Sequence, residues 1–117
     1  NFQDFLSTYV FADAPYVPTP IAGAIVAARA ANKDFEKTVF SQMRLGPEAF
    51  LLQQRLPLIK QPTLLLWCDG DKIIDPSAAA VFAEGLAHST TVMLNGCGHM
   101  PMMEQPEAVA AALLGAL

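Results

Sequence analysis

Residues 59–74 read IKQPTLLLWCDGDKII, and this stretch decides the fold class of the chain. Its centre, residues 63–68, is short and continuously apolar, with Pro62 before it and a turn-forming Asp-Gly pair after it. Such a run is typical of a strand that is buried on both faces, as strands are in parallel sheets. We therefore predict a buried strand that leads directly into an acidic loop containing Asp69 and Asp71.

Strands and helices alternate on the C-terminal side of this strand. The sequence predicts a helix from Pro76 to about Gly85, a second short strand over residues 90–94, a loop over 95–105 and a last helix from Pro106 to the C-terminus. Two strands joined in this way are expected to form a parallel pair, and the crossover of such a pair is right-handed in nearly all known cases. The predicted fold class is therefore α/β, with parallel strands and crossover helices.

The residues on the N-terminal side show a helical pattern instead, and the change falls near Pro57. Apolar residues recur at helical spacing over residues 2–11. After a proline-rich stretch, an Ala-rich helix is predicted over residues 20–31, because Ala is the best helix former. Two further helices are predicted to begin at Asp34 and at Pro47, since Asp and Pro favour helix starts.

Composition restricts the partners of the chain. It has 117 residues, 53% of them hydrophobic and 15% charged, and its net charge is −4. Because globular proteins usually have about 25% charged residues, we expect either a buried part of a larger domain or an apolar working surface. The basic residues are scattered, so no nucleic-acid partner is expected. The longest nearly apolar stretch, residues 21–31, is shorter than the roughly 20 residues that span a bilayer, so no transmembrane segment is predicted.

Two loops of the predicted fold carry residues that could perform chemistry. In open α/β sheets, ligands bind beyond the carboxyl ends of the strands, where Asp71 follows the first predicted strand and His99 the second. A histidine that acts as a base needs a carboxylate on Nδ1, which fixes its tautomer and stabilises its cation. Asp-Gly-Asp turns also form for backbone reasons alone, and loop histidines are often surface residues. The residues by themselves therefore leave a catalytic pair and an ordinary turn as alternatives.

Neither a metal site nor a cofactor is expected. Asp69 and Asp71 are spaced like the start of a calcium loop, but Ile73 occupies the next ligand position, where Asp or Asn is needed. His99 and Glu104 lack the spacing of a zinc-binding helix.

Read together, the last 60 or so residues resemble the end of α/β-hydrolase-fold enzymes. In that family the strand leads into Trp-Gly, two variable residues, then Asp-Arg or Asp-Lys and two aliphatic residues, so that Asp71 falls on the acid of the catalytic triad. The stretch GCGHMP over residues 96–101, with Glu104 and Pro106, matches the histidine loop of the family, so that His99 falls on the base. The resemblance implies the C-terminal part of an α/β-hydrolase fold.

Within this family the chain is similar to bacterial Moraxella-type lipases and to monoacylglycerol lipases. Asp75 with Ser77 resembles their Asp-x-Ser after the acid loop, and residues 9–20 resemble a proline- and aromatic-rich stretch of their cap. The resemblance implies a carboxylic ester hydrolase that acts on a small-molecule ester or lipid. Haloalkane dehalogenases, epoxide hydrolases and C–C bond hydrolases share both loops and are alternative activities.

The resemblance also implies a serine nucleophile in a Gly-x-Ser-x-Gly elbow, and no such motif occurs in the chain. We therefore expect the nucleophile and the oxyanion donors in a missing N-terminal half, and we expect this chain alone to be inactive. A non-catalytic fragment or binding module is the alternative. The first residues lack the basic region of a signal peptide. A cytoplasmic location is expected, with a membrane-associated or secreted one if a signal lies in the missing half.

By the same resemblance, residues 1–56 form a helical cap or lid and residues 57–117 the C-terminal part of the hydrolase core. Phe11 and Tyr16 are then candidates for the wall of an acyl-chain pocket, and Met100 for its lining. Packing among helices is the alternative role of all three.

Three further side chains near the two loops have expected roles. Glu104 is expected to bond backbone within its loop. Cys68 and Cys97 are too few for a disulfide scaffold and fit no zinc motif, so free buried thiols are expected. Cys68 stands where the family usually has Gly, and Cys97 follows the neighbouring strand, so a bridge between them is the alternative.

Overall fold

A computed structural model of the chain describes residues 1–43 and 52–116. Its centre is a pair of parallel strands, β1 (Thr63–Cys68) and β2 (Ser89–Leu94), in a register that pairs Thr63 with Ser89 and Cys68 with Leu94. Helix α5 (Ser77–Gly85) makes the crossover between them. The predicted strand–helix–strand unit and the α/β fold class are thereby confirmed.

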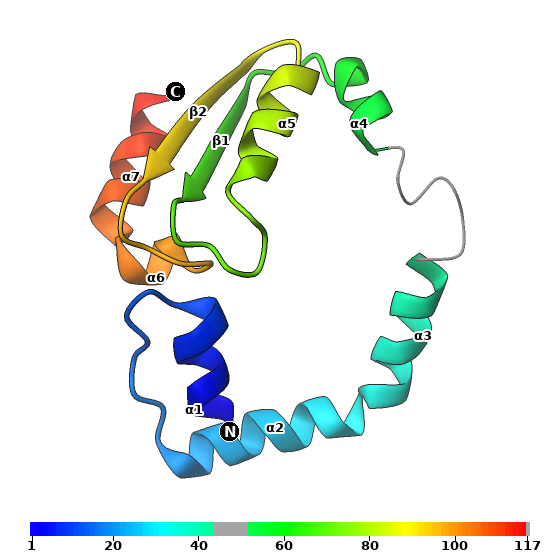
Figure 1. The fold of residues 1–117 in the computed structure, drawn as a ribbon, viewed down its shortest axis with the longest axis vertical. Helices are drawn as coiled ribbons and strands as arrows, with labels where there is room; N and C mark the ends of the chain where they lie inside the picture. The colour runs from blue at the N-terminus through cyan, green and yellow to red at the C-terminus, as the bar shows by residue number, and fades with distance from the viewer. Residues whose placement is uncertain (44–51, 117) are drawn as a thin grey trace.

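Helices cover the strand pair on both sides. Helix α5 contacts both strands and α7 (Pro106–Gly115) contacts β1, and Figure 1 shows the two helices on opposite sides of the strands. A short helix, α6 (Pro101–Glu104), precedes α7. The prediction of an uninterrupted loop over residues 95–105 is therefore wrong, because Pro101 begins a helical turn in the position that proline favours.

The N-terminal part is helical, as predicted. Helix α1 (Phe2–Phe5) continues directly into the π-helix η1 (Leu6–Val10), and α2 (Thr19–Ala31) is followed after one residue by α3 (Lys33–Met43). Helix α3 begins one residue before Asp34, which therefore lies in its first turn. Within the described residues no helix is both long enough and apolar enough to cross a membrane.

The helix predicted from Pro47 begins outside the described residues. Its described part is α4 (Leu52–Arg55), which passes into a single 3₁₀ turn, η3 (Leu56–Leu58). The helical path therefore continues through Pro57, because a proline in the first turn of a helix loses no hydrogen bond.

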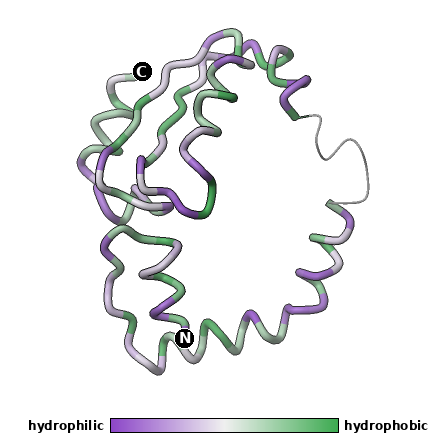
Figure 2. The backbone as a smooth tube through the Cα atoms, in the orientation of Figure 1, coloured by the Kyte–Doolittle hydropathy of each residue, from purple (hydrophilic) through white to green (hydrophobic). Residues whose placement is uncertain are grey.

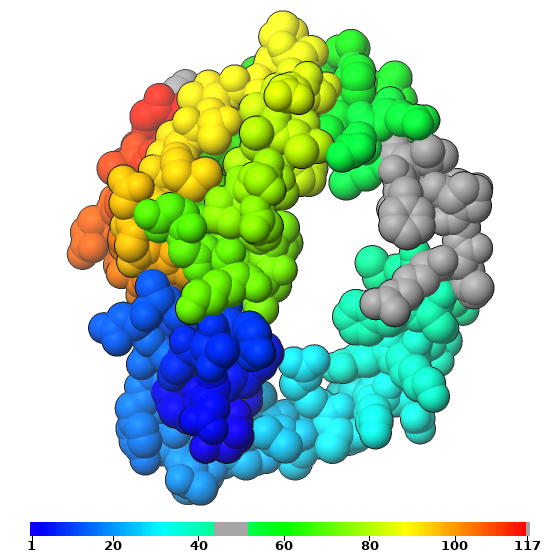
Figure 3. All heavy atoms as spheres, viewed as in Figure 1, coloured from blue at the N-terminus to red at the C-terminus, as the bar shows by residue number. Residues whose placement is uncertain are grey.

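The chain has an open shape rather than that of a compact domain. Helices α2 and α3 arc away from the strand pair (Figure 1), and no described side chain fills the space between them and α5 in the space-filling view (Figure 3). The radius of gyration is 17.0 Å, against about 13 Å for a compact domain of this length. The open shape leaves much apolar surface without cover from the described residues.

Hydrophobic burial is correspondingly small. Among the described residues, six hydrophobic side chains are buried: Phe11, Leu56, Cys68, Ala79, Leu86 and Cys97. Figure 2 shows hydrophobic residues along α2 and α7 as well, and most of these are exposed. Contiguous exposed apolar surface normally marks a place where another part of a protein, or a ligand, packs. Two of the six buried residues, Cys68 and Cys97, lie where β1 and β2 end, so the buried centre adjoins the candidate site.

Candidate active site

Two loops leave the carboxyl ends of the strands, and hydrogen bonds join them. We call residues 69–75 the acid loop and residues 95–105 the histidine loop. The amide of Asp69 donates to the carbonyl of Leu94 (2.9 Å), and the side chain of Asp69 accepts from the amide of Gly96 (2.8 Å). The amide of Gly70 donates to the carbonyl of Cys97 (3.1 Å). A Cβ on Gly70 would lie 2.7 Å from that carbonyl oxygen, so only glycine permits this approach.

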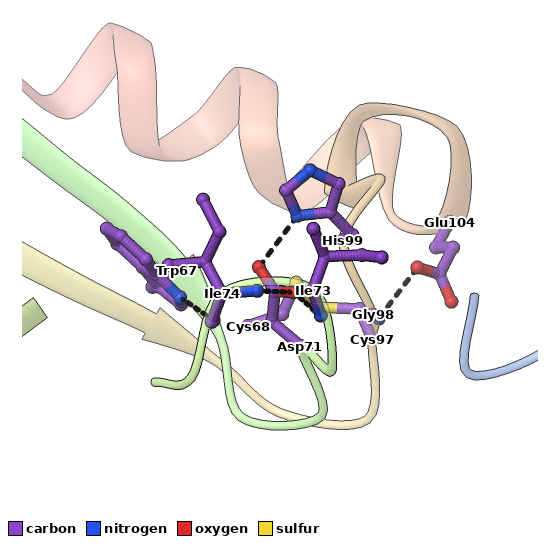
Figure 4. A network of polar contacts seen from close by, with 9 residues as sticks. All are labelled: Trp67, Cys68, Asp71, Ile73, Ile74, Cys97, Gly98, His99 and Glu104. Carbon is purple, nitrogen blue, oxygen red and sulfur yellow. Dashed lines mark hydrogen bonds and ion pairs between the residues drawn. A yellow bond between two sulfur atoms is a disulfide. The ribbon is translucent and has the colours of Figure 1, made fainter. Parts of the chain in front are cut away.

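Asp71 is held by three donors. Its Oδ1 accepts from the amides of Ile73 (2.9 Å) and Ile74 (3.0 Å), and its Oδ2 lies 2.9 Å from Nδ1 of His99 (Figure 4). The indole of Trp67 donates to the carbonyl of Ile74 and so fixes the far end of the acid loop. Only 8% of the Asp71 side chain is exposed, so the carboxylate depends on these donors rather than on water.

The hydrogen bonds to Asp71 control its ionisation. Burial raises the pKa of Asp71, but the bond from His99, the two backbone amides and the nearby His99 charge together hold this pKa below its ordinary value. Asp71 is therefore ionised at neutral pH and can only accept a hydrogen bond. Nδ1 of His99 must then carry the proton, which leaves Nε2 of a neutral ring free to accept another.

The backbone of His99 is held from the N-terminal side of the chain. The amide of His99 donates to the carbonyl of Val10 (2.6 Å), where η1 ends. A Cβ on Gly98 would lie 2.6 Å from this carbonyl oxygen and 2.9 Å from the amide nitrogen of Ala12. The histidine loop and the end of η1 therefore meet backbone to backbone, and glycine is required at this contact.

Glu104 joins the same two segments. Its Oε1 accepts from the amide of Gly98 (2.7 Å) and its Oε2 from the amide of Ala12 (2.8 Å). The expectation that Glu104 bonds backbone in its loop is confirmed. The bond to Ala12 spans 92 positions of the sequence and was not predicted, because a backbone donor carries no side-chain signal in the sequence.

A disulfide joins the end of β1 to the histidine loop. Cys68 and Cys97 are bridged, with their Cα atoms 5.3 Å apart and both residues buried. The expectation of free thiols is therefore wrong, and the alternative holds. The physical reason is the parallel register, which pairs Cys68 with Leu94, so both strands end side by side. The chain after Leu94 then turns back toward Cys68 and brings Cys97 beside it.

The three candidate substrate contacts differ in their surroundings. Phe11 is buried beside the histidine loop, and Met100, next to His99, is half-buried. Tyr16 is 78% exposed, in a segment tied to α1 by Gln3, whose side chain bonds the backbone of Pro15 and Val17. The structure thus places Phe11 against the histidine loop, of which Met100 is a part, and leaves Tyr16 on the surface.

The cavities of the described residues do not by themselves identify a substrate site. One of about 720 Å³ lies at the amino ends of β1 and β2, beside Thr63 and Ser89, and therefore at the opposite end of the strands from Asp71 and His99. Another of about 400 Å³ lies beside Phe11 and Glu104. No group of three metal-binding side chains occurs in the described part of the chain.

Comparisons with known proteins identify the family of the chain. Residues 3–112 match the family model described as "Alpha/beta hydrolase family". The chain is 31% identical over 98 residues to the monoacylglycerol lipase ABHD6 of Bos taurus, and this match covers 84% of the chain and 29% of that lipase. It is 27% identical over 107 residues to lipase 3 of Moraxella sp., covering 87% of the chain and 33% of the lipase.

A solved structure is similar over nearly the whole chain. It is that of a membrane phospholipase A described as a bacterial virulence factor, with a TM-score of 0.80 and 36% identity. The match covers 98% of this chain and 37% of that one. The chain thus spans about a third of the length of each of these relatives.

Proposed function

This chain belongs to the alpha/beta hydrolase family, and from that premise we propose that it is the part of a carboxylic ester hydrolase that supplies the acid, Asp71, and the base, His99, of a Ser-His-Asp triad. The observation that carries the proposal is the 2.9 Å contact between Oδ2 of Asp71 and Nδ1 of His99 at the ends of two parallel strands. The named lipases among its relatives support ester hydrolysis as the reaction.

In the proposed reaction, the serine lies in the remainder of a longer polypeptide or on a second chain. The serine Oγ attacks the ester carbonyl while Nε2 of His99 takes its proton. The tetrahedral intermediate then breaks its bond to the alcohol, and His99 gives the proton to the departing oxygen. A water molecule, deprotonated by the same nitrogen, then attacks the acyl carbonyl. The bond from that carbon to the serine Oγ breaks, the carboxylic acid is released, and His99 returns the proton to the serine.

Asp71 stays ionised throughout this cycle. It holds the Nδ1 proton of His99 and stabilises the imidazolium that forms each time Nε2 is protonated. The lowered pKa of Asp71 supports this role, because a carboxyl group that remains charged is always an acceptor. The side chain of His99 is about one third exposed, which leaves its ring accessible to a nucleophile from outside this chain.

We further propose that residues 1–56 form a cap over the site and that Phe11, Tyr16 and Met100 contact the acyl chain of a lipid ester. The contact between Val10 and His99 supports this proposal, because it brings the N-terminal helices to the histidine loop. The relatives that support a lipid substrate are the monoacylglycerol lipase and the membrane phospholipase A.

The test uses the full polypeptide that contains this chain. A fluorophosphonate probe is expected to label one serine outside residues 1–117, and a short-chain p-nitrophenyl ester is expected to be hydrolysed. His99→Ala should abolish both reactions, while His88→Ala, which changes an exposed histidine just before β2, should leave them intact. A fully active and fully labelled His99→Ala variant would refute the proposal. A protein that neither takes the label nor cleaves the ester would also refute the proposal and would leave the other hydrolase activities and a binding module as the alternatives.

A further inference from the structure

The carboxylate of Glu104 has both oxygens engaged by backbone amides from two distant parts of the chain. Oε1 accepts from Gly98 at 2.7 Å, while Oε2 accepts from Ala12 at 2.8 Å and makes a longer contact with Asp13 at 3.4 Å. Figure 4 shows the bond to Gly98, with the N-terminal segment passing beside the same carboxylate. Glu104 is therefore the side chain that links the histidine loop to the segment after η1.

The bond from Gly98 to Glu104 fixes the backbone directly before His99. Gly98 precedes His99, and the amides of both are engaged, the first by Glu104 and the second by the carbonyl of Val10. The backbone of His99 is thus held on one side by Glu104 and on the other by the end of η1. The ring of His99 is held separately, by Asp71.

We infer that Glu104 is a positioning residue of the triad, which sets the place of Nε2 by fixing the backbone of Gly98 and His99 against residues 10–13. The inference rests on the proposed function, since it concerns the base of that reaction. Its physical basis is that a displacement of about 1 Å at a reacting group lowers a rate by about 10²-fold. A second basis is that Gly98 is buried, and a buried backbone amide needs a hydrogen-bond partner.

The role requires a carboxylate rather than any polar group. Glutamine has almost the same shape, but it offers one acceptor oxygen and an NH₂ group that only donates. In Glu104→Gln, the NH₂ group would face an amide hydrogen of Gly98 or of Ala12, and one of the two bonds is lost. This change therefore breaks the link between the two segments without opening a cavity.

The experiment compares Glu104→Gln with Glu107→Gln in the full polypeptide. Glu107 is exposed in the first turn of α7 and undergoes the same chemical change. Competent sites are counted by fluorophosphonate titration, and kcat per titrated site and KM are measured on a short-chain p-nitrophenyl ester. For Glu104→Gln we expect kcat per site to fall about 10- to 100-fold and KM to stay within about twofold. Glu107→Gln should match the wild type.

A purely structural role gives a different result. Glu104→Gln would then lower the number of titrated sites or the Tm and leave kcat per site at the wild-type value, which would overturn the inference. If the wild type itself is neither labelled nor active, the proposed function fails instead, so the two failures are distinguishable.

A second variant applies if Glu104→Gln does not fold. Ala12→Pro replaces the amide hydrogen that Glu104 accepts by a ring carbon, which displaces the carboxylate and breaks this bond. The extended backbone of Phe11 is the conformation that a following proline favours. A several-fold loss of kcat per site at constant KM supports the inference, and wild-type kcat in this variant overturns it.

Discussion

Nδ1 of His99 lies 2.9 Å from Oδ2 of Asp71, although 28 positions separate the two residues in the sequence. The register of the strands produces this contact, because Cys68 pairs with Leu94 and places the two strand ends side by side. Asp71 follows three residues after Cys68 and His99 five residues after Leu94. Short loops, cross-linked by backbone bonds and a disulfide, then leave the two side chains little freedom to separate.

Asp71→Asn is expected to lower kcat of the full polypeptide by about 10⁴-fold while leaving the fold intact. The amide oxygen can still accept from Ile73 and Ile74, but the NH₂ group would then face Nδ1 and favour the tautomer with a protonated Nε2. Steady-state kinetics check the prediction. Asp69→Asn is the matched control, because its amide oxygen can replace the one acceptor that Gly96 uses. Equal rates for the two variants would contradict the proposed role of Asp71.

The ionisation of Asp71 is expected to make the stability of the full polypeptide pH-dependent. Because its pKa is lower in the folded state, its contribution is complete above the ordinary Asp pKa of about 3.9 and is lost as the pH falls through the folded value. The difference in the free energy of unfolding between wild type and Asp71→Asn should therefore be constant near neutral pH and shrink below about pH 4. Denaturant titrations at several pH values measure this difference. If this difference instead grew as the pH fell below about 4, the pKa of Asp71 would be raised rather than lowered in the folded state.

The Cys68–Cys97 disulfide is expected to stabilise the folded state by restricting the unfolded chain. Its two residues are 29 positions apart, and the chain-entropy relation for a loop of this length gives about 3–4 kcal/mol. The double variant Cys68→Ala with Cys97→Ala should lose stability on this scale in denaturant unfolding. Alkylation of the wild type without reductant should leave its mass unchanged, and labelling of both thiols would show that the bridge is absent. Disulfides persist mainly in oxidising compartments, so a bridge formed in cells would argue against the expected cytoplasmic location.

The aromatic residues proposed to contact substrate are expected to affect chain-length preference. Phe11→Ala would open space beside the histidine loop, and Tyr16→Ala would remove an exposed ring. Relative kcat/KM values on p-nitrophenyl esters from two to sixteen carbons measure the effect, with longer chains the more affected. If the ratios stay as in the wild type in both variants, neither residue contacts the acyl chain.

The strand ends and the loops that follow them were predictable from the sequence. A short apolar run followed by Asp-Gly-Asp fits a buried strand that ends in a turn, and few other structures. Parallel strands predicted that the two loops meet, but the residues alone left an ordinary turn as the alternative, and the resemblance to α/β-hydrolases singled out Asp71 and His99. The disulfide did not follow, since the state of two thiols depends on small distances and on redox conditions. The bond between Glu104 and Ala12 was also missed, because it joins a side chain to a backbone amide 92 positions away. The hydrophobic periodicity of the sequence does not indicate which backbone amide a distant side chain will bond.

Gly98→Ala is expected to impair both the stability and the catalysis of the full polypeptide, because of the backbone contact that holds His99. An added Cβ would lie 2.6 Å from the carbonyl oxygen of Val10 and 2.9 Å from the amide nitrogen of Ala12, both of which belong to the backbone and cannot rotate away. The histidine loop must then shift away from η1, which weakens the bond between the amide of His99 and Val10. We expect a destabilisation of about 1–3 kcal/mol, as for other overpacked sites, and a fall in kcat.

Gly23→Ala is the matched control for this change, because Gly23 lies inside α2 and an added Cβ there meets no atom within 4 Å. Alanine is favoured over glycine in a helix by about 0.5–1 kcal/mol, so this variant should be slightly more stable than the wild type and equally active. Thermal unfolding and kcat measured on both variants make the comparison. If Gly98→Ala is as stable and as active as Gly23→Ala, the histidine loop can accommodate a Cβ at position 98 despite the close contact with Val10 and Ala12. The backbone of His99 would then not depend on the N-terminal segment for its position.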